Sequence, residues 1–156
     1  MITTQKPILD LTAADLMTRD LVCLPHEMSM KEAARLLLQN HISGAPVVDN
    51  HGQCIGVLSA TDFVTLTKKI GDKGHPCVGS TEWEVVVEMM PEDELAQFMT
   101  PDPVMVSPRT SICRLARQMV DAHIHRVIVV DAENRPIGIV TSTDLVAALA
   151  YANYPH

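Results

Sequence analysis

Apolar residues recur with the same helical spacing in two stretches that lie far apart along this chain. In each stretch the apolar side chains fall at i, i+3, i+4, i+7 and i+8, directly after Ser29 and directly after Ser111. This spacing is typical of an amphipathic helix that buries one face. A serine before the first turn is a common N-cap, and Glu32 completes a capping box in the first stretch. The sequence therefore predicts two amphipathic helices, whose apolar faces consist of Met30, Ala33, Ala34, Leu37 and Leu38 and of Ile112, Leu115, Ala116, Met119 and Val120.

Short β-branched runs follow each predicted helix and are joined in pairs by a polar turn. Such paired runs predict two neighbouring strands, and a shorter apolar run before each helix predicts one more. Each half of the chain therefore reads as strand, helix, strand, strand, helix. The predicted strands lie at Val22, 46–48 and 55–58 with a last helix over 61–69, and at Val104, 127–130 and 137–140 with a last helix over 143–151.

The two halves are copies of one unit, because they align without a gap when one is shifted by 82 positions. Met17-Thr18 then matches Met99-Thr100, and Thr61-Asp62 matches Thr143-Asp144. A three-stranded sheet with two helices leaves one apolar face uncovered in a unit of about fifty residues. We therefore expect an α/β (α+β) fold of two tandem β-α-β-β-α units, packed face to face with pseudo-twofold symmetry.

The repeat sets the expected domain boundaries. The first unit covers residues 11–69 and the second covers residues 95–152, and residues 70–94 between them have no counterpart in the other half. A connection of this length inside a small domain is often functional. We expect it to be a loop insertion that covers a site or a partner surface.

The charge and the aromatic content of the chain argue against nucleic acids and membranes as partners. The net charge is −7 and aromatic residues make up only 3% of the chain. A nucleic acid or an anionic membrane needs a basic face, and single-stranded nucleic acid also needs stacking aromatic side chains. No apolar run is long enough to cross a membrane, residues 1–10 do not form a signal peptide, and the four cysteines are far apart. We therefore expect a cytoplasmic protein with reduced thiols and neither nucleic acid nor membrane as a partner.

Two matching stretches carry candidate chemistry. They read G-V-L-S-A-T-D-F at Gly56 to Phe63 and G-I-V-T-S-T-D-L at Gly138 to Leu145. A Ser or Thr followed three positions later by Asp is a helix capping box, which needs no ligand. The same oxygens and N–H groups at a helix N-terminus also suit an anion and a sugar hydroxyl. The pattern alone leaves both interpretations open, although a glycine within the strand also permits close backbone approach.

The two stretches, the M-T openings and the P-V-V-D and I-V-V-D strands resemble the cystathionine-β-synthase (CBS) domain pair, or Bateman module. The resemblance implies two clefts between the units that bind adenosine-containing ligands such as AMP, ADP, ATP or S-adenosylmethionine. It also implies that the aspartate holds the ribose hydroxyls and that the Ser and Thr residues hold phosphate. In this family two pairs commonly associate, so a homodimer is expected.

The resemblance implies more ligand-binding residues in the second copy than in the first. Ala60 in the first copy replaces Ser142, and Gly44 replaces Arg126. The implied ligand residues of the second copy are Asp144 for ribose, Thr141, Ser142, Thr143 and Arg126 for phosphate, and Val104, Met105 and Val127 for the base. Those of the first copy are Asp62 for ribose, Ser59 and Thr61 for phosphate, and Val22, Cys23, Ala45 and Pro46 for the base.

The leading hypothesis is a regulatory module that senses an adenine nucleotide, requires no cofactor and signals to a partner protein. An enzyme is not expected, because the sequence shows no catalytic constellation, P-loop or G-x-G-x-x-G. One alternative is a homodimerising scaffold without a ligand. A weaker one is a metal or redox sensor that uses histidines such as His41 and His123 together with the cysteines, although metal sites usually need three or more converging ligands.

Overall fold

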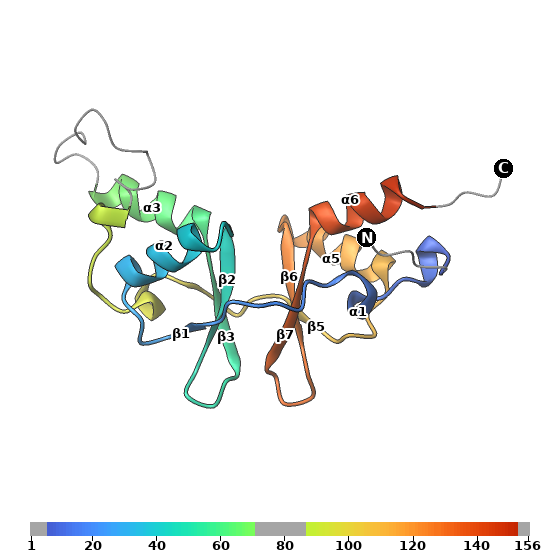
Figure 1. The fold of residues 1–156 in the computed structure, drawn as a ribbon, viewed down its shortest axis with the longest axis horizontal. Coiled ribbons are helices and arrows are strands. Elements are labelled where there is room, and N and C mark those ends of the chain that lie inside the picture. Colours follow the sequence, from blue (N-terminus) through green and yellow to red (C-terminus); the bar gives the residue numbers. More distant parts are fainter. Residues whose placement is uncertain (1–5, 71–86, 153–156) are drawn as a thin grey trace. The chain divides into compact units, whose positions relative to one another are not determined.

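The computed structural model describes residues 6–70 and 87–152. The chain forms two compact units. We call residues 22–103 the central unit, and residues 1–21 together with 104–156 the terminal unit. Each unit is a small sheet with helices beside it (Figure 1), so the expected mixed fold of two tandem repeats is confirmed.

The central unit contains a four-stranded sheet in the order β1-β2-β3-β4. Strand β1 is parallel to β2, whereas β2 with β3 and β3 with β4 are antiparallel. Helices α2 and α3 lie together on one face of this sheet (Figure 1). The elements are β1 (Leu24–Pro25), α2 (Met30–Gln39), β2 (Gly44–Val48), β3 (Cys54–Ser59), α3 (Ala60–Ile70), the 3-10 turn η2 (Leu95–Gln97) and β4 (Thr100–Pro101).

The terminal unit repeats this arrangement with a three-stranded sheet in the order β5-β6-β7. Helices α5 and α6 accompany it as α2 and α3 accompany the central sheet. Its elements are η1 (Ile8–Asp10), α1 (Ala13–Leu16), β5 (Met105–Val106), α5 (Ile112–Ala122), β6 (Arg126–Val130), β7 (Pro136–Thr141) and α6 (Ser142–Ala150). The predicted order of strand, helix, strand, strand, helix is therefore present in both copies.

The segment that opens each repeat pairs with the sheet of the other repeat. Thr18 donates its N–H to the Ile139 carbonyl at 2.9 Å and accepts the Ile139 N–H at 3.1 Å, so it extends β7. Likewise Thr100 pairs with Val57 of β3. The predicted boundaries 11–69 and 95–152 follow the repeat along the chain and stay a prediction. In space, the two compact units exchange their opening segments.

Each sheet and its helices enclose an apolar core. In the central unit Leu24, Met30 and Leu58 are fully buried, and in the terminal unit Leu115 and Val129 are. Burying one such side chain contributes about 1.5–3 kcal/mol to stability. Most of the predicted apolar faces of the two amphipathic helices, including Ala33 and Met119, lie in these cores. Leu38 and Val120 are the exceptions, because their side chains remain exposed.

Both predicted serine N-caps are present. The Ser29 hydroxyl accepts the Glu32 N–H at 3.1 Å, and the Ser111 hydroxyl accepts the Arg114 N–H at 3.3 Å. The predicted capping box of Glu32 is wrong, since its carboxylate makes no recorded bond back to Ser29 among the described residues. The Ser29 backbone forms a β-bridge with Glu94, held by the Met30 N–H to the Asp93 carbonyl and the Leu95 N–H to the Met28 carbonyl.

Residues 87–95 pack on α2 and α3. Val87, Met90 and Leu95 belong to the core of the central unit. The carbonyls of Asp93 and Pro91 accept the N–H groups of Met30 and Lys31 at 2.9 and 3.2 Å, and so cap the start of α2. The rest of the predicted loop insertion, residues 71–86, lies outside the described residues.

The strand glycines of the two repeated stretches receive the methionines of the exchanged segments. A Cβ atom added at Gly138 would lie 2.7 Å from Met17 Cγ and 2.8 Å from Met17 Cβ, and would clash with Met17 Sδ. A Cβ added at Gly56 would lie 3.1 Å from Met99 Cγ and 3.0 Å from the Thr100 carbonyl, and would clash with Met99 Sδ. Each glycine therefore makes room for a side chain that joins the opening segment to the sheet.

We predict that Gly138→Ala lowers the free energy of unfolding by about 1–3 kcal/mol, because an extra methyl group overpacks a filled contact. Gly56→Ala should cost less, since it first meets the flexible end of Met99, whereas Gly138→Ala also meets Met17 Cβ. Urea unfolding of the two variants measures the difference. Met99→Ala should recover part of the loss in the Gly56→Ala background and make the two changes non-additive. Equal costs at both glycines, or strict additivity, would contradict this role of the methionines.

Candidate functional site

The stretch Thr141 to Asp144 joins β7 to α6 through a capping box. Asp144 Oδ2 accepts the Thr141 N–H at 2.7 Å and the Thr141 hydroxyl at 3.0 Å. In return, the Asp144 N–H donates to Thr141 Oγ1 at 3.2 Å. All the recorded bonds of this carboxylate use Oδ2, and the described residues give Oδ1 no recorded donor. The cap therefore leaves one carboxylate oxygen available to a ligand.

The matching stretch Ser59 to Asp62 uses both carboxylate oxygens. Asp62 Oδ2 accepts the Ser59 N–H at 2.8 Å and the Ser59 hydroxyl at 3.3 Å. Asp62 Oδ1 accepts the hydroxyl of Thr100 at 3.0 Å. Thr100 is the threonine of the exchanged opening segment, so the fold itself occupies the oxygen that Asp144 keeps free. The residue pattern did not reveal this role of Thr100, because only the exchange brings it to Asp62.

The sheet register brings the predicted phosphate residues of the second copy to one end of the terminal unit. Arg126 on β6 lies directly opposite Thr141 on β7. The Ser142 N–H donates to the His125 carbonyl at 2.8 Å and closes the turn between the strand and α6. Thr143 is exposed in the first turn of α6. The N-terminus of this helix carries a partial positive charge that favours an anion. In the central unit the register places Gly44 opposite Ser59 and offers no cation there.

The residues predicted to contact the base are less accessible to a ligand than the predicted phosphate residues. Ala45, Pro46 and Val127 are fully buried, so a base would touch their side chains only after covering groups move. Val104 and Met105 are half-buried at and just before β5, and β5 flanks β6 on the side away from β7. Val22 and Cys23 precede β1 in the same way. The role of these seven residues stays a prediction.

The two strand glycines do not serve a ligand in the way that the sequence suggested. We expected Gly56 and Gly138 to permit close backbone approach at a binding site. The atoms that approach them are those of Met99 and Met17. The glycines are therefore explained by the exchange of the opening segments and provide no independent support for a ligand.

Little in the described part of the chain favours metal or redox chemistry. No three His, Cys, Asp or Glu side chains gather there as metal ligands. Desolvation raises the pKa of the Cys23 thiol, and burial raises that of Cys54. A raised pKa lowers the fraction of reactive thiolate at neutral pH. His41 and His123 instead end α2 and α5 in the left-handed conformation, each with φ of 54°, as expected for helix ends.

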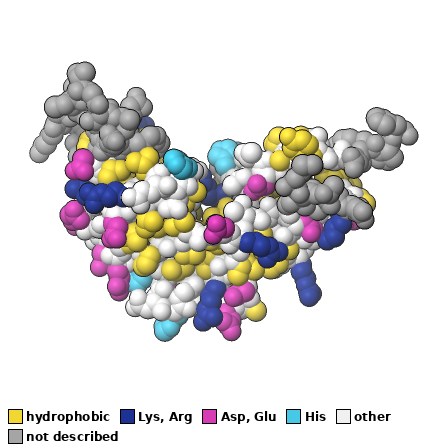
Figure 2. Space-filling model, in the orientation of Figure 1, with side chains coloured by type: hydrophobic (Ala, Val, Ile, Leu, Met, Phe, Trp, Pro, Cys, Tyr) yellow, Lys and Arg dark blue, Asp and Glu magenta, His cyan; other side chains and the backbone are white. Residues whose placement is uncertain are grey.

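The surface of the described residues carries mixed charge. Figure 2 shows basic and acidic side chains interspersed on the face it presents, without a continuous basic patch. Every helix in residues 6–70 and 87–152 is too short or too polar to cross a lipid bilayer.

Comparison with known proteins identifies relatives of the whole chain. It is 29% identical over 149 residues to the CBS domain-containing protein CBSX2, chloroplastic, of Arabidopsis thaliana, an alignment that covers 88% of this chain and 63% of the relative. The chain therefore spans less than two thirds of that relative's length. A crystal structure of CBSX2 in complex with AMP has a TM-score of 0.71 and 26% identity, and covers 90% of this chain and 96% of that one.

A second solved structure agrees in fold. The CBS domain pair of MJ0100, in complex with 5′-methylthioadenosine and S-adenosyl-L-methionine, has a TM-score of 0.71 at 22% identity and covers 88% of this chain and 98% of that one. The model of the CBS domain matches residues 13–68 and again residues 95–151 of the chain. The two matches coincide with the two copies of the repeat, and the chain belongs to the CBS domain family.

Proposed function

We propose that this chain is a regulatory module that binds an adenosine-containing nucleotide at the Thr141–Asp144 turn of the terminal unit and signals to a partner protein. AMP, ADP, ATP and S-adenosylmethionine are the candidate ligands. The observation that carries the proposal is the free Oδ1 of Asp144 at the start of α6, with Arg126 opposite Thr141. The CBSX2 structure with AMP supports the choice of ligand class.

The geometry suits both ends of a nucleotide. A carboxylate oxygen that needs no further internal partner can accept a ribose hydroxyl in a charge-assisted hydrogen bond. The N–H groups at the start of α6 and the Arg126 guanidinium provide positive potential for phosphate. None of these groups performs chemistry on the ligand, so the proposed role is regulatory and requires no cofactor. Three described cysteines are free, in keeping with a reducing compartment such as the cytoplasm.

The central unit is the weaker candidate for the same ligand. Its aspartate, Asp62, already accepts the Thr100 hydroxyl through Oδ1. Ala60 lacks the hydroxyl of Ser142, and Gly44 lacks the charge of Arg126. A ribose would have to displace Thr100, and a phosphate would find no cation from β2. We therefore propose that the terminal unit binds nucleotide more tightly.

We also propose that the chain forms a homodimer through helices α5 and α6. Val120 is 71% exposed, Val146 63% and Leu149 54%, and Figure 2 shows hydrophobic side chains gathered over α6. Exposed apolar side chains that gather on one face often mark a protein-protein contact. The scaffold alternative shares this surface and differs only in that it needs no nucleotide.

We predict that Asp144→Asn weakens AMP binding by at least about tenfold, because it removes the charge from the hydrogen bond to ribose. Asparagine can retain the cap to the Thr141 N–H, so the fold should survive. Asp62→Asn is the matched control and should leave AMP affinity nearly unchanged. Isothermal titration calorimetry measures both. At about one hundred times the dissociation constant, AMP should stabilise the unmodified chain by roughly 2.7 kcal/mol. No stabilisation by any of the four nucleotides would favour the scaffold alternative.

Arg126→Gln should separate phosphate recognition from nucleoside recognition. We expect it to weaken AMP binding by about tenfold, since one charge-assisted contact to phosphate is lost. Adenosine has no phosphate, so its affinity should not change. Titration of the same variant with both ligands checks this. Equal loss for AMP and adenosine would show that Arg126 supports the fold and does not contact phosphate.

Val146→Glu should convert the dimer into monomers, because it places a charge in the apolar contact on α6. Sedimentation velocity measures the change in mass. Ala132→Glu adds the same charge at the exposed turn between β6 and β7 and should leave the dimer intact. A monomeric unmodified chain, or a Val146→Glu variant that remains dimeric, would contradict the assignment of this face.

A further inference from the structure

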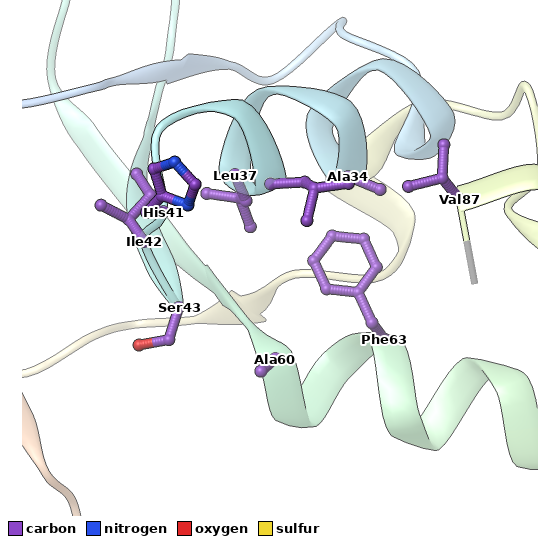
Figure 3. A pocket seen from close by; sticks show the side chains of 9 residues that line it. Ala34, Leu37, His41, Ile42, Ser43, Ala60, Phe63 and Val87 are labelled. Atoms are coloured by element: carbon purple, nitrogen blue, oxygen red, sulfur yellow. The ribbon is translucent and has the colours of Figure 1, made fainter. Parts of the chain in front are cut away.

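A cavity of about 360 Å³ lies inside the central unit, between α2 and α3 (Figure 3). Among its described lining residues, Ala60 alone occupies a position that the family resemblance assigns to the nucleotide, that of Ser142 in the second copy. Its walls come from α2, from residues 42 and 43 before β2, from the start of α3 and from Val87. All of these belong to one compact unit, so the cavity exists independently of how the two units are arranged.

The interior of the cavity is apolar, and the hydrophobic core holds its lining side chains in place. Leu37, Phe63 and Val87 are only 5%, 3% and 7% exposed, so their positions are fixed by the surrounding core. Figure 3 shows the Phe63 ring extending from α3 toward Ala34 and Leu37 of α2. His41 lies at the opposite end from Val87 and provides the one titratable group among the lining residues.

The fold alone does not require these lining residues. The two repeats share their elements and register, yet the copies differ at several cavity positions. Phe63 corresponds to Leu145 in the second copy, Ala60 to Ser142 and Ser43 to His125. The first copy therefore combines an aromatic wall with smaller side chains toward the His41 end. The second copy builds the same elements without this combination and without a counterpart of Val87, so these lining residues are particular to the first copy.

We propose that this cavity is a second binding site, for a small uncharged aromatic molecule with one hydrogen-bonding group. Its volume lies near the lower end of the range of about 300–1,000 Å³ typical of ligand pockets, which suits a single bicyclic ring better than a nucleotide. The Phe63 ring offers an aromatic contact to such a molecule. The His41 imidazole can accept or donate one hydrogen bond at the opposite end.

A charged ligand does not fit these surroundings. Arg35 of α2 is paired with Glu88 at 3.7 Å. No Lys, Arg, Asp or Glu side chain is among the described lining residues. Moving a charge into an apolar cavity without a counter-ion is costly. The ligand is therefore uncharged, in contrast to the phosphorylated ligand proposed for the terminal unit.

Indole is the probe for this site, and methyl-selective NMR of the full chain is the measurement. Titration with indole should produce saturable chemical-shift changes at the methyl groups of Leu37 and Val87. Ala34→Leu extends a wall residue into the cavity and should abolish these changes while the melting temperature stays equal or rises. Ala116→Leu, at the same position of the second copy, is the matched control and should bind indole as the unmodified chain does.

Two further variants test the cavity if Ala34→Leu does not fold and separate this site from the proposed nucleotide site. Should Ala34→Leu fail to fold, Phe63→Leu introduces the residue of the second copy and should weaken indole binding several-fold. Asp144→Asn should bind indole normally, so a failure of the nucleotide proposal does not affect this one. Indole that leaves the Leu37 and Val87 methyl signals unchanged would overturn the proposal. Binding that strengthens on dilution, in step with dissociation of a dimer, would identify a second copy as the occupant and would also overturn it.

Discussion

The contact between a methionine and a strand glycine is the constraint on which both units depend. Gly138 and Gly56 leave no room for a Cβ beside Met17 and Met99, so each opening segment lies directly against the sheet of the other repeat. This placement lets Thr18 pair with Ile139 and gives the central unit its fourth strand. Two copies of a marginal fifty-residue unit thereby become mutually dependent, because neither completes its sheet with its own segment.

The same exchange makes the two aspartates unequal. The segment that completes the central sheet brings Thr100 to Asp62 and binds Oδ1 of that carboxylate. No corresponding bond from Thr18 to Asp144 is recorded among the described residues, although Thr18 occupies the matching position. The oxygen that we propose for a ligand contact in Asp144 is the one that a structural hydrogen bond occupies in Asp62. The first copy also has Gly44 and Ala60 where the second has Arg126 and Ser142, so both differences make the second copy the better candidate for a ligand.

The sequence predicted the elements well, because hydrophobic spacing and capping are local properties. The helices after Ser29 and Ser111 and the strand pairs behind them all lie where the pattern placed them. It did not predict which sheet each M-T segment joins, since the partner lies more than a hundred residues from Met17. For the same reason the sequence did not reveal that Gly138 makes room for Met17 or that Thr100 binds Asp62. It also did not predict the β-bridge between Ser29 and Glu94, which lie 65 residues apart, and it predicted a return bond from Glu32 that is not recorded among the described residues.

Comparison of the two copies helps to distinguish residues that the fold requires from residues that serve one copy alone. Positions that agree between the copies, such as Asp62 and Asp144 or His41 and His123, serve the cap or the helix end in both units. Positions that differ between the copies are not fixed by the shared elements, and some of them lie at the two proposed sites. Arg126 and Ser142 distinguish the proposed nucleotide site of the terminal unit, whereas Phe63 and Ser43 distinguish the cavity of the central unit. The two proposals therefore rest on differences between the copies: a polar site for an anion in the terminal unit and an apolar site in the central unit.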